Sequence, residues 1–312
     1  MRILVTGGAG FIGSHLTDAF LNRGDQVTVV DDLSADSSAR LDERVVLHTQ
    51  SITQAEPLAA LVEEIRPALV CHLAAQIDVR ASVAFPADDA QVNVVGSVNV
   101  LEAARRVDAR VLFCSSGGAL YGRDAPIPTV ETVPPLPESP YGVAKFCAEQ
   151  YVGLYNRLHG TAHAVLRLAN VYGPRQDPTG DGGVVAIFCS RALAGKRPTI
   201  YGDGKQTRDY VYVGDVVAAF LAAADTHRPG SWNIGTGIET TVLDLAATIG
   251  EAAGRDVEPE FAPQRPGELP RSALAAELAE RELGWSAATS LADGVRAVYR
   301  WIESGTPDRA GS

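Results

Sequence analysis

Residues 1–32 read MRILVTGGAGFIGSHLTDAFLNRGDQVTVVDD, and this stretch decides the fold. An apolar run at 2–6 is typical of a buried strand, and residues 11–21 carry apolar side chains at helical spacing before a second apolar run at 26–30. The order strand, turn, helix, strand places two strands parallel in one sheet. The turn contains glycines at the spacing of a phosphate-binding loop: Gly7, Gly10 and Gly13.

These glycines and the helix after them predict an anionic ligand. The first permits the tight turn, the second lets a pyrophosphate approach the backbone, and the third lets the helix pack closely on the strand. Asp31 ends the second strand, roughly twenty residues beyond the glycines. A carboxylate there accepts the adenosine ribose hydroxyls and repels a 2′-phosphate, so the stretch predicts NAD rather than NADP. The alternative, a glycine turn that binds no dinucleotide, leaves Asp31 without a role.

The chain continues this alternation of strands and helices. Strands are expected at 45–48, 68–73, 111–114 and 164–168, and helices at 54–65, 88–107 and 141–159. The helix at 88–107 is expected to carry on one apolar face Val92, Val95, Val98, Leu101 and Ala104. The order predicts an α/β fold, a Rossmann-type doubly wound parallel sheet.

Beyond residue 173 the pattern breaks into shorter pieces rich in glycine and proline. Helices are expected at 184–194, 213–224, 242–253, 276–283 and 291–302. We therefore expect an NAD-binding Rossmann domain over 1–173, which includes the catalytic residues. A smaller C-terminal α/β substrate-binding lobe is expected over 174–312, with some segments returning to the core.

Composition argues against several other classes. The chain has 312 residues, 46% hydrophobic and 21% charged, and its net charge of −11 without a basic cluster argues against a nucleic-acid partner. No apolar run reaches the length of a membrane span and the first residues read as a strand, so a cytoplasmic protein is expected. The cysteines lie far apart, without metal-ligand spacing, and are expected to be reduced: Cys71, Cys114, Cys147 and Cys189. No metal site is expected.

A tyrosine and a lysine indicate the catalytic site. Tyr141 and Lys145, in YGVAK, stand four residues apart, so both side chains project from one face of the expected helix. Beside a cofactor, the tyrosine can exchange a proton with a substrate hydroxyl, and the lysine lowers the tyrosine pKa and holds the nicotinamide ribose. The pair alone is a weak signal, but it follows a dinucleotide fingerprint and a strand that ends in two serines.

The chain resembles the extended short-chain dehydrogenase/reductase family. The motifs are TGGAGFIG (6–13), HLAA (72–75), SSGGALYG (115–122), YGVAK (141–145), LRLANVYGPRQ (166–176) and GDGKQTRDYVYV (202–213). They follow the family's order and spacing, and within the family the chain is similar to nucleotide-sugar epimerases. The resemblance implies NAD-dependent inversion at C4 of a UDP-sugar such as UDP-glucose or UDP-galactose, through a transient 4-keto sugar.

The resemblance also assigns residues to the cofactor. It implies that the pyrophosphate is held by Gly7, Gly10, Phe11 and Ile12, the adenosine ribose by Asp31, Asp32 and Ser34, the adenine by Ser51 and Ile52, and the rest by Leu73, Ala74, Ala75, Gln76, Ser115, Tyr141 and Lys145. In place of Ser51 the family usually has an aspartate, so this chain departs from the pattern at the adenine.

For the substrate, the resemblance implies contacts from both halves of the chain. The diphosphate would meet Asn170, Arg208 and Arg265, and the nucleoside ribose would meet Glu268. Ser272 aligns with a position that gates an N-acetyl group at C2. Either its small size also admits UDP-N-acetyl sugars, or it is a plain loop serine.

The catalytic hydroxyl is the main departure from the family. Tyr141 would be the base and Lys145 its helper, but the family's Ser or Thr, four residues before the tyrosine of SSGGALYG, is Gly117 here. Either Ser116 supplies the hydroxyl, which we favour, or Ser115 does, or Tyr141 acts with less help.

Other activities and an assembly were weighed. A 4,6-dehydratase needs an Asp-Glu pair where this chain has Gly118 and Ala119. A UDP-glucuronate 4-epimerase or decarboxylase needs a cation for the sugar carboxylate, and Arg80 offers one unless it is only a surface arginine. A non-catalytic NAD-binding regulator conflicts with the Tyr-Lys pair. The helices at 88–107 and 141–159 resemble the family's dimer helices, which predicts a homodimer; the alternative is that both faces cover the sheet.

Overall fold

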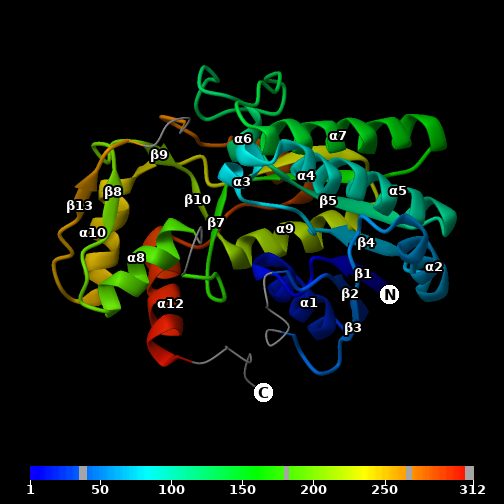
Figure 1. Ribbon diagram of the computed structural model, residues 1–312, viewed down its shortest axis with the longest axis horizontal. Coiled ribbons are helices and arrows are strands. Elements are labelled where there is room, and N and C mark those ends of the chain that lie inside the picture. Colours follow the sequence, from blue (N-terminus) through cyan, green and yellow to red (C-terminus); the bar gives the residue numbers. More distant parts are fainter. Residues whose placement is uncertain (35–40, 179–182, 265–268, 306–312) are drawn as a thin grey trace. The chain divides into compact units, whose positions relative to one another are not determined.

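The computed structural model describes residues 1–34, 41–178, 183–264 and 269–305 (Figure 1). The chain divides into two compact units. The first comprises 1–120, 135–167 and 217–232, and the second comprises 121–134, 168–216 and the residues from 233 onward. The chain therefore passes between the units several times. The domain boundary expected after residue 173 stays a prediction.

A seven-stranded sheet forms the centre of the first unit, in the order β11-β6-β5-β4-β1-β2-β3. Its strands are β1 (Arg2–Thr6), β2 (Gln26–Asp31), β3 (Val46–Thr49), β4 (Leu69–His72), β5 (Arg110–Ser116), β6 (Ala164–Leu168) and β11 (Gly230–Ile234). β1 pairs in parallel with both β2 and β4, and β4 pairs in parallel with β5. The strand order reverses between β1 and β4, and ligands of such sheets bind at the carboxyl ends of the strands at this point. The predicted Rossmann-type fold is confirmed.

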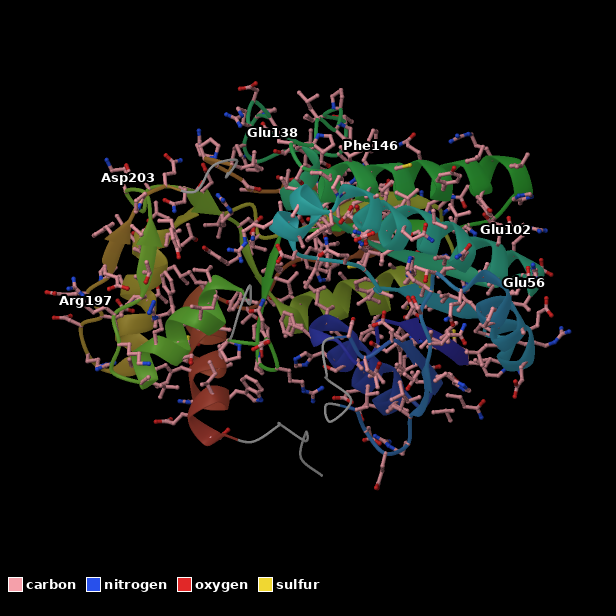
Figure 2. All side chains as sticks on the ribbon, viewed as in Figure 1. Glu56, Glu102, Glu138, Phe146, Arg197 and Asp203 are labelled. Atoms are coloured by element: carbon pink, nitrogen blue, oxygen red, sulfur yellow. The ribbon has the colours of Figure 1, made fainter. Side chains whose placement is uncertain are left out.

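Amphipathic helices cover one face of this sheet. In α2 (Ala55–Ile65), Glu56 is exposed while Leu58 and Leu61 are buried, at helical spacing. Figure 2 shows Glu56 on this helix and Glu102 on α5 (Gly96–Arg106). Such alternation predicts a helix without any further signal, and the buried side of α2 packs against α5.

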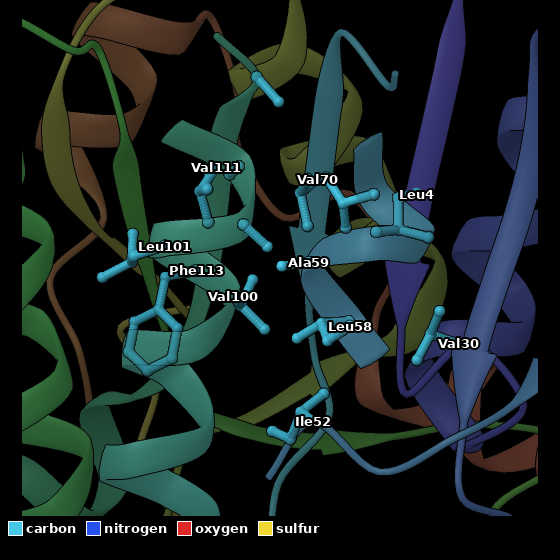
Figure 3. Close-up of a cluster of buried hydrophobic side chains, with 14 of the residues drawn as sticks. Leu4, Val30, Ile52, Leu58, Ala59, Val70, Val100, Leu101, Val111 and Phe113 are labelled. Atoms are coloured by element: carbon cyan, nitrogen blue, oxygen red, sulfur yellow. The ribbon is translucent and has the colours of Figure 1, made fainter. Parts of the chain in front are cut away.

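The core of the first unit lies between these helices and the sheet (Figure 3). Leu58 and Val100 meet alternate residues of the strands, among them Leu4, Val70 and Val111, all 3% exposed or less. The helix α7 (Pro140–His159) completes this layer with Ala148 and Val152, and α1 (Phe11–Asn22) packs against β1 and β2. Each large side chain buried here stabilises the fold by about 1.5–3 kcal/mol.

The segment expected as one helix at 88–107 is helical, but a π-helical turn interrupts its regular α-helical geometry. The segment consists of α4 (Pro86–Ala90), a π-helical turn over Gln91–Val95, and α5. Val95, expected on the apolar face, is 42% exposed, whereas Asn93 is 1% exposed. The cause is the amide of Asn93, whose buried hydrogen bonds to neighbouring polar groups override the apolar pattern. Before α4 lies a short helix that was not expected, α3 (Val79–Ala84).

The second unit is built from short strand pairs and longer helices. Its strands are β7 (Asn170–Tyr172), β8 (Thr199–Tyr201), β9 (Thr207–Arg208), β10 (Tyr210–Tyr212), β12 (Thr240–Thr241) and β13 (Glu260–Ala262), which pair as β7 with β10, β8 with β13, and β9 with β12. The core lies among α8 (Val184–Leu193), α10 (Val242–Ala253) and α12 (Leu291–Ser304) and includes Leu245 and Val295. The helix α11 (Glu277–Leu283) also belongs to this unit, whereas α6 (Gly117–Leu120) belongs to the first unit and α9 (Val213–Thr226) begins in the second and continues into the first.

The helices beyond residue 173 begin and end within about two residues of their expected positions. Within the described parts of the chain, every helix is too short or too polar to span a bilayer.

Candidate active site

The turn between β1 and α1 is closed against the loop that follows β4. The N–H of Gly7 donates to the carbonyl oxygen of Val30 (2.8 Å), and Gly7 has a φ of +70°, in the left-handed region. A Cβ atom at Gly7 would lie 2.6 Å from the backbone nitrogen of Ala74 and 2.9 Å from the carbonyl carbon of Leu73. Glycine is therefore required at the point where the sheet order reverses.

Helix α1 begins directly at this turn. Its N-cap residue is Gly10, which has no side chain to satisfy the first N–H groups of the helix. A Cβ atom at Gly13 would lie 2.1 Å from the carbonyl oxygen of Gly7, so close packing of helix on turn depends on this glycine as well. The N–H groups of Phe11 and Ile12 stand in the first helical turn, where they suit a phosphate oxygen. These residues fit the pyrophosphate of a dinucleotide.

Asp31 orders the other side of the turn. Its Oδ2 accepts from the N–H of Ala9 (3.0 Å) and its Oδ1 accepts from the N–H of Leu33 (2.9 Å). Asp32 is exposed and its Oδ1 accepts from the N–H of Ser34 (3.0 Å). The Asp31 carboxylate thus stands at the carboxyl end of β2 beside the glycine turn, as a dinucleotide ribose requires.

Ser51 and Ile52 follow β3 on the same edge of the sheet. The N–H of Gln50 donates to the carbonyl oxygen of Asp31 (3.0 Å), which links the two segments. The hydroxyls of Ser51 and Thr53 share a hydrogen bond of 2.9 Å, and Ile52 is 4% exposed. The segment is therefore held beside Asp31, and the Ser51 hydroxyl is engaged within it.

The loop after β4 starts from a buried histidine. Nδ1 of His72 lies 2.8 Å from the hydroxyl of Thr6, and Nε2 lies 2.9 Å from the hydroxyl of Ser97. Burial, helped by the positive charge of Lys145, lowers the pKa of His72 to about 3. The ring is therefore neutral at physiological pH and serves to hold β1, β4 and α5 together.

Gln76 closes this loop against the π-helical turn. Its N–H donates to Oδ1 of Asn93 (3.1 Å), and Nδ2 of Asn93 donates back to the carbonyl oxygen of Gln76 (2.9 Å). The side-chain Nε2 of Gln76 donates to the carbonyl oxygen of Asp78 (3.0 Å) and to Oδ1 of Asp89 (2.9 Å). Asp89 is 1% exposed, and burial raises its pKa. The network fixes the loop that lies against Gly7.

Tyr141 and Lys145 project from the start of α7 toward the end of β5. Nζ of Lys145 donates to the carbonyl oxygen of Cys114 (3.1 Å) and lies 5.9 Å from the centre of the Tyr141 ring. Lys145 is 3% exposed, and burial lowers its pKa, while the negative charges of Asp89 and Glu149 act in the opposite sense. The ammonium is thus held beneath the phenol, which is partly exposed.

The two serines at the end of β5 differ in what they contact. Desolvation raises the pKa of Tyr141, and a hydrogen bond between its phenol and the Ser116 side chain opposes that rise. Ser116 is partly exposed beside the phenol, whereas Ser115 is 3% exposed. The Ser115 hydroxyl has no hydrogen-bond partner within the described parts of the chain. Gly117 is buried at the start of α6 and brings no hydroxyl.

Two of the predicted substrate residues of the second unit, Asn170 and Arg208, lie at or next to β9. The N–H of exposed Asn170 donates to the carbonyl oxygen of Asp209 (2.9 Å). Nη1 of Arg208 donates to the carbonyl oxygens of Thr207 (2.7 Å) and Leu269 (2.8 Å). Ser272 is partly exposed, three residues beyond Leu269. Arg265 and Glu268 lie outside the described residues.

Asp209 holds this part of the second unit together. It is 0% exposed, and its carboxylate accepts from the N–H groups of Thr236 (2.9 Å), Gly237 (3.1 Å) and Leu274 (3.1 Å) and from the hydroxyl of Thr236 (2.6 Å). Burial raises its pKa, and these hydrogen bonds oppose the rise. Three loops are therefore joined through one side chain adjacent to Arg208.

Sequence reasoning missed four polar residues of these networks: Ser82, Asp89, Asn93 and Asp209. A polar residue inside the apolar pattern was the available signal for Asn93. Asp209 lies within the motif GDGKQTRDYVYV, but its burial and its role could not be predicted, because its partners are distant in the chain and most are backbone N–H groups.

The structure also shows the positions of the residues that bear on a UDP-glucuronate epimerase, a decarboxylase or a 4,6-dehydratase. Arg80 lies on α3 with a side chain 60% exposed, 4.0 Å from Asp78. Gly118 and Ala119 in α6 bring no carboxylate. Among the described residues, no group of His, Cys, Asp and Glu is arranged to hold a metal ion. The four cysteines are thiols.

Known proteins share this architecture. A model of the NAD dependent epimerase/dehydratase family matches residues 3–235. The UDP-glucose 4-epimerase of Mycolicibacterium smegmatis is 45% identical over 311 residues, 97% of this chain and 99% of the relative. The structure of the UDP-glucose 4-epimerase of Thermotoga maritima with UDP-glucose matches at a TM-score of 0.96 and 44% identity, over 98% of this chain and 99% of that one. The structure of the Thermus thermophilus UDP-glucose 4-epimerase in complex with NAD matches at a TM-score of 0.92 and 40% identity, over 98% of this chain and 100% of that one. The likeness extends over the sequence of both units.

Proposed function

The chain belongs to the NAD dependent epimerase/dehydratase family, and from this premise we propose that it inverts C4 of a UDP-sugar, interconverting UDP-glucose and UDP-galactose. One observation carries the proposal: the phenol of Tyr141 bonds the Ser116 side chain above the buried Lys145 ammonium. The enzyme is an NAD-dependent isomerase, and NAD acts as its resident cofactor.

The first unit supplies the residues that would hold NAD. The glycine turn and the start of α1 would bind the pyrophosphate. Asp31 and its neighbours would bind the adenosine ribose, and the loop after β4 would contact the middle of the cofactor. The residues proposed for these contacts are Gly7, Gly10, Phe11, Ile12, Asp31, Asp32, Ser34, Ser51, Ile52, Leu73, Ala74, Ala75, Gln76 and Ser115. When bound, NAD supplies a reversible acceptor for the hydrogen on C4 of the sugar.

The proton steps belong to the residues of α7 and β5. Tyr141 takes the proton of the C4 hydroxyl. After the sugar has turned its opposite face toward the cofactor, Tyr141 returns a proton to the same oxygen. Lys145 stabilises the phenolate by its charge, because an ammonium near a phenol favours the ionised form. Ser116 hydrogen-bonds the C4 oxygen and the phenol together. Its contact with Tyr141 supports this role over Ser115, whose hydroxyl is buried.

The second unit would anchor the nucleotide and leave the sugar able to turn. We assign the diphosphate to Asn170, Arg208 and Arg265, the nucleoside ribose to Glu268, and the C2 substituent of the sugar to Ser272. The two carbonyl oxygens that accept from Nη1 of Arg208 orient its guanidinium, which supports its role as an anion ligand.

We further propose a homodimer that forms through the two helical segments expected for it, 88–107, which extends from α4 to α5, and 141–159, which lies in α7. Figure 1 shows α7 beside α4 and α5 in the first unit, and these helices pack on one another. Large apolar side chains are 40–66% exposed on α7 and near α4: Val143, Leu154 and Leu158 on α7, Val95 in the π-helical turn, Val83 on α3 and Phe85 directly before α4. An apolar face of this kind favours association with a second copy. The cytoplasmic location expected from the sequence stays a prediction.

Incubation of the purified protein with single nucleotide sugars tests the function. We expect UDP-glucose and UDP-galactose each to yield the same equilibrium mixture, read by chromatography. Bound NAD without any turnover would reduce the protein to an NAD-binding regulator. Turnover of UDP-glucuronate alone would contradict the proposal and point to Arg80 as the ligand of a sugar carboxylate. Equal turnover of the N-acetylated sugars would support the assignment of Ser272.

A further inference from the structure

The first turn of α7 is satisfied by two serine side chains from different parts of the chain. The N–H of Gly142 donates to the hydroxyl of Ser139, the local N-cap (3.1 Å), and the N–H of Val143 donates to the carbonyl oxygen of Ser139 (2.9 Å). Pro140 has no N–H. The one remaining amide, that of Tyr141, donates to the hydroxyl of Ser82 on α3 (3.2 Å).

The Ser82 hydroxyl has a fixed orientation. It donates to the carbonyl oxygen of Val79 (2.7 Å), so its hydrogen is engaged and a lone pair faces the Tyr141 amide. Ser82 is 0% exposed, and its own N–H donates to the carbonyl oxygen of Asp78 (3.0 Å). No water competes at this position, because the side chain is fully covered.

Helix α3 is itself tied to the loop after β4. Asp78 caps the helix by accepting from the N–H groups of Arg80 (2.7 Å) and Ala81 (3.1 Å). The side chain of Gln76 accepts from the N–H of Asp78 and donates to its carbonyl oxygen. A continuous set of hydrogen bonds therefore connects the loop packed on Gly7 with the backbone of Tyr141.

We propose that Ser82 is a positioning residue for the reaction: it fixes the backbone of Tyr141 from α3 while Ser116 holds the phenol. The proposal rests on the proposed function, since it assumes that the Tyr141 phenol reacts. A tyrosine held at both ends keeps its oxygen in place between two opposite faces of a turning sugar. Misplacement by a fraction of an ångström costs rate without weakening substrate binding.

The test is Ser82→Ala in the protein with its bound NAD, with Ser290→Ala as the matched control. Ser290 is also a helix cap, whose hydroxyl accepts from the N–H of Asp293 on α12 (3.1 Å), in the second unit. We expect Ser82→Ala to lower kcat about fivefold to tenfold, the effect of one lost hydrogen bond, with KM and NAD content unchanged. Ser290→Ala should leave kcat unchanged.

Amide hydrogen exchange gives a readout independent of turnover. In Ser82→Ala the segment 139–145 should exchange about tenfold faster, whereas in Ser290→Ala it should exchange as in the wild type. Unchanged exchange in this segment, or an unchanged kcat, would overturn the positioning role. Ser82→Thr, which keeps the hydroxyl, should restore slow exchange and most of kcat. Should the wild type show no epimerisation, the proposed function fails, and the exchange experiment still decides whether Ser82 holds the Tyr141 amide.

Discussion

The two units of the molecule position their candidate residues in different ways. In the first, most candidate residues stand at or near the ends of strands of one sheet, each four to seven residues long, next to a glycine turn in which side chains do not fit. In the second, Asn170 and Arg208 stand on strands of two or three residues, next to loops that are joined through the buried carboxylate of Asp209. The first arrangement is set by local sequence patterns, and the second by contacts between distant residues.

This difference predicts a division of labour between chemistry and binding. A site on rigid strand ends suits the proton and hydrogen transfers, which tolerate little misplacement. Short loops that are joined through the side chain of Asp209 suit the binding of a nucleotide. Variants in the first unit should therefore change kcat, and variants in the second should change KM.

Replacement of Tyr141 by Phe should have the largest effect. The ring and its packing remain, but the proton carrier is lost, so kcat should fall by about 10³-fold while KM and NAD content stay unchanged. Steady-state kinetics together with NAD released on denaturation measure both quantities. A Phe variant that keeps more than a tenth of the activity would remove the tyrosine from the mechanism.

Asp209→Ala should have the next largest effect, on binding and stability. Three N–H groups and a hydroxyl lose their acceptor, so we expect the free energy of unfolding to fall by about 3 kcal/mol and KM to rise about tenfold with little change in kcat. Asp203→Ala is the control, because this aspartate of the same unit has a side chain 68% exposed (Figure 2). A loss of kcat at constant KM would contradict the division between the units.

Replacing each of the two serines at the end of β5 by Ala should give kcat values that differ by about thirtyfold. Ser116→Ala removes the hydroxyl that contacts the phenol, so kcat should fall by about 30-fold, as expected for loss of one hydrogen bond to a charged group, about 2 kcal/mol. Ser115→Ala should leave the kcat of the NAD-loaded protein within about twofold of the wild type. The reverse result would assign the catalytic hydroxyl to Ser115 and contradict our choice.

Acid should destabilise the first unit more than the second. This is the smallest of the expected effects. All six histidines lie in the first unit, and burial lowers the pKa of His72 to about 3 and of His163 to about 4. Below pH 6.5 these histidines become protonated in the unfolded chain but stay neutral in the folded protein. The free energy of unfolding therefore decreases as the pH falls from about 6.5 toward 4. From pH 6.5 to 5.5 the free energy of unfolding should drop by about 2 kcal/mol for the two together.

Urea titrations at the two pH values measure this loss. Asp89 and Asp209, whose pKa values are raised by burial, act in the opposite sense, since protonation of either favours the folded state. Replacing His72 and His163 by Gln should flatten the pH dependence, whereas His159→Gln, at an exposed position, should preserve it. Limited proteolysis at pH 5.5 should cut the first unit before the second. Earlier cleavage of the second unit would contradict this assignment.

The same contrast explains what the sequence could predict. The alternation of apolar residues with glycine turns predicts the sheet, and helices such as α2 and α10 follow from their periodicity. The turn at Gly7 could be predicted because each glycine has a local steric reason. Asp209 could not, because an aspartate joined to backbone groups far along the chain leaves no periodic signal. The π-helical turn at Asn93 reverses an apolar pattern for the same reason: its stabilising hydrogen bonds come from Gln76 and Asp89.

The central claim is that one carbon of the sugar loses and regains the same hydrogen inside the protein. The most direct measurement uses UDP-glucose with deuterium at C4, incubated with the purified protein in ordinary water, and mass spectrometry of the UDP-galactose formed. We predict that the product keeps its deuterium, because the hydrogen returns from the bound cofactor and never meets solvent. Loss of the deuterium to water would show that the carbon exchanges a proton instead, and would contradict the account.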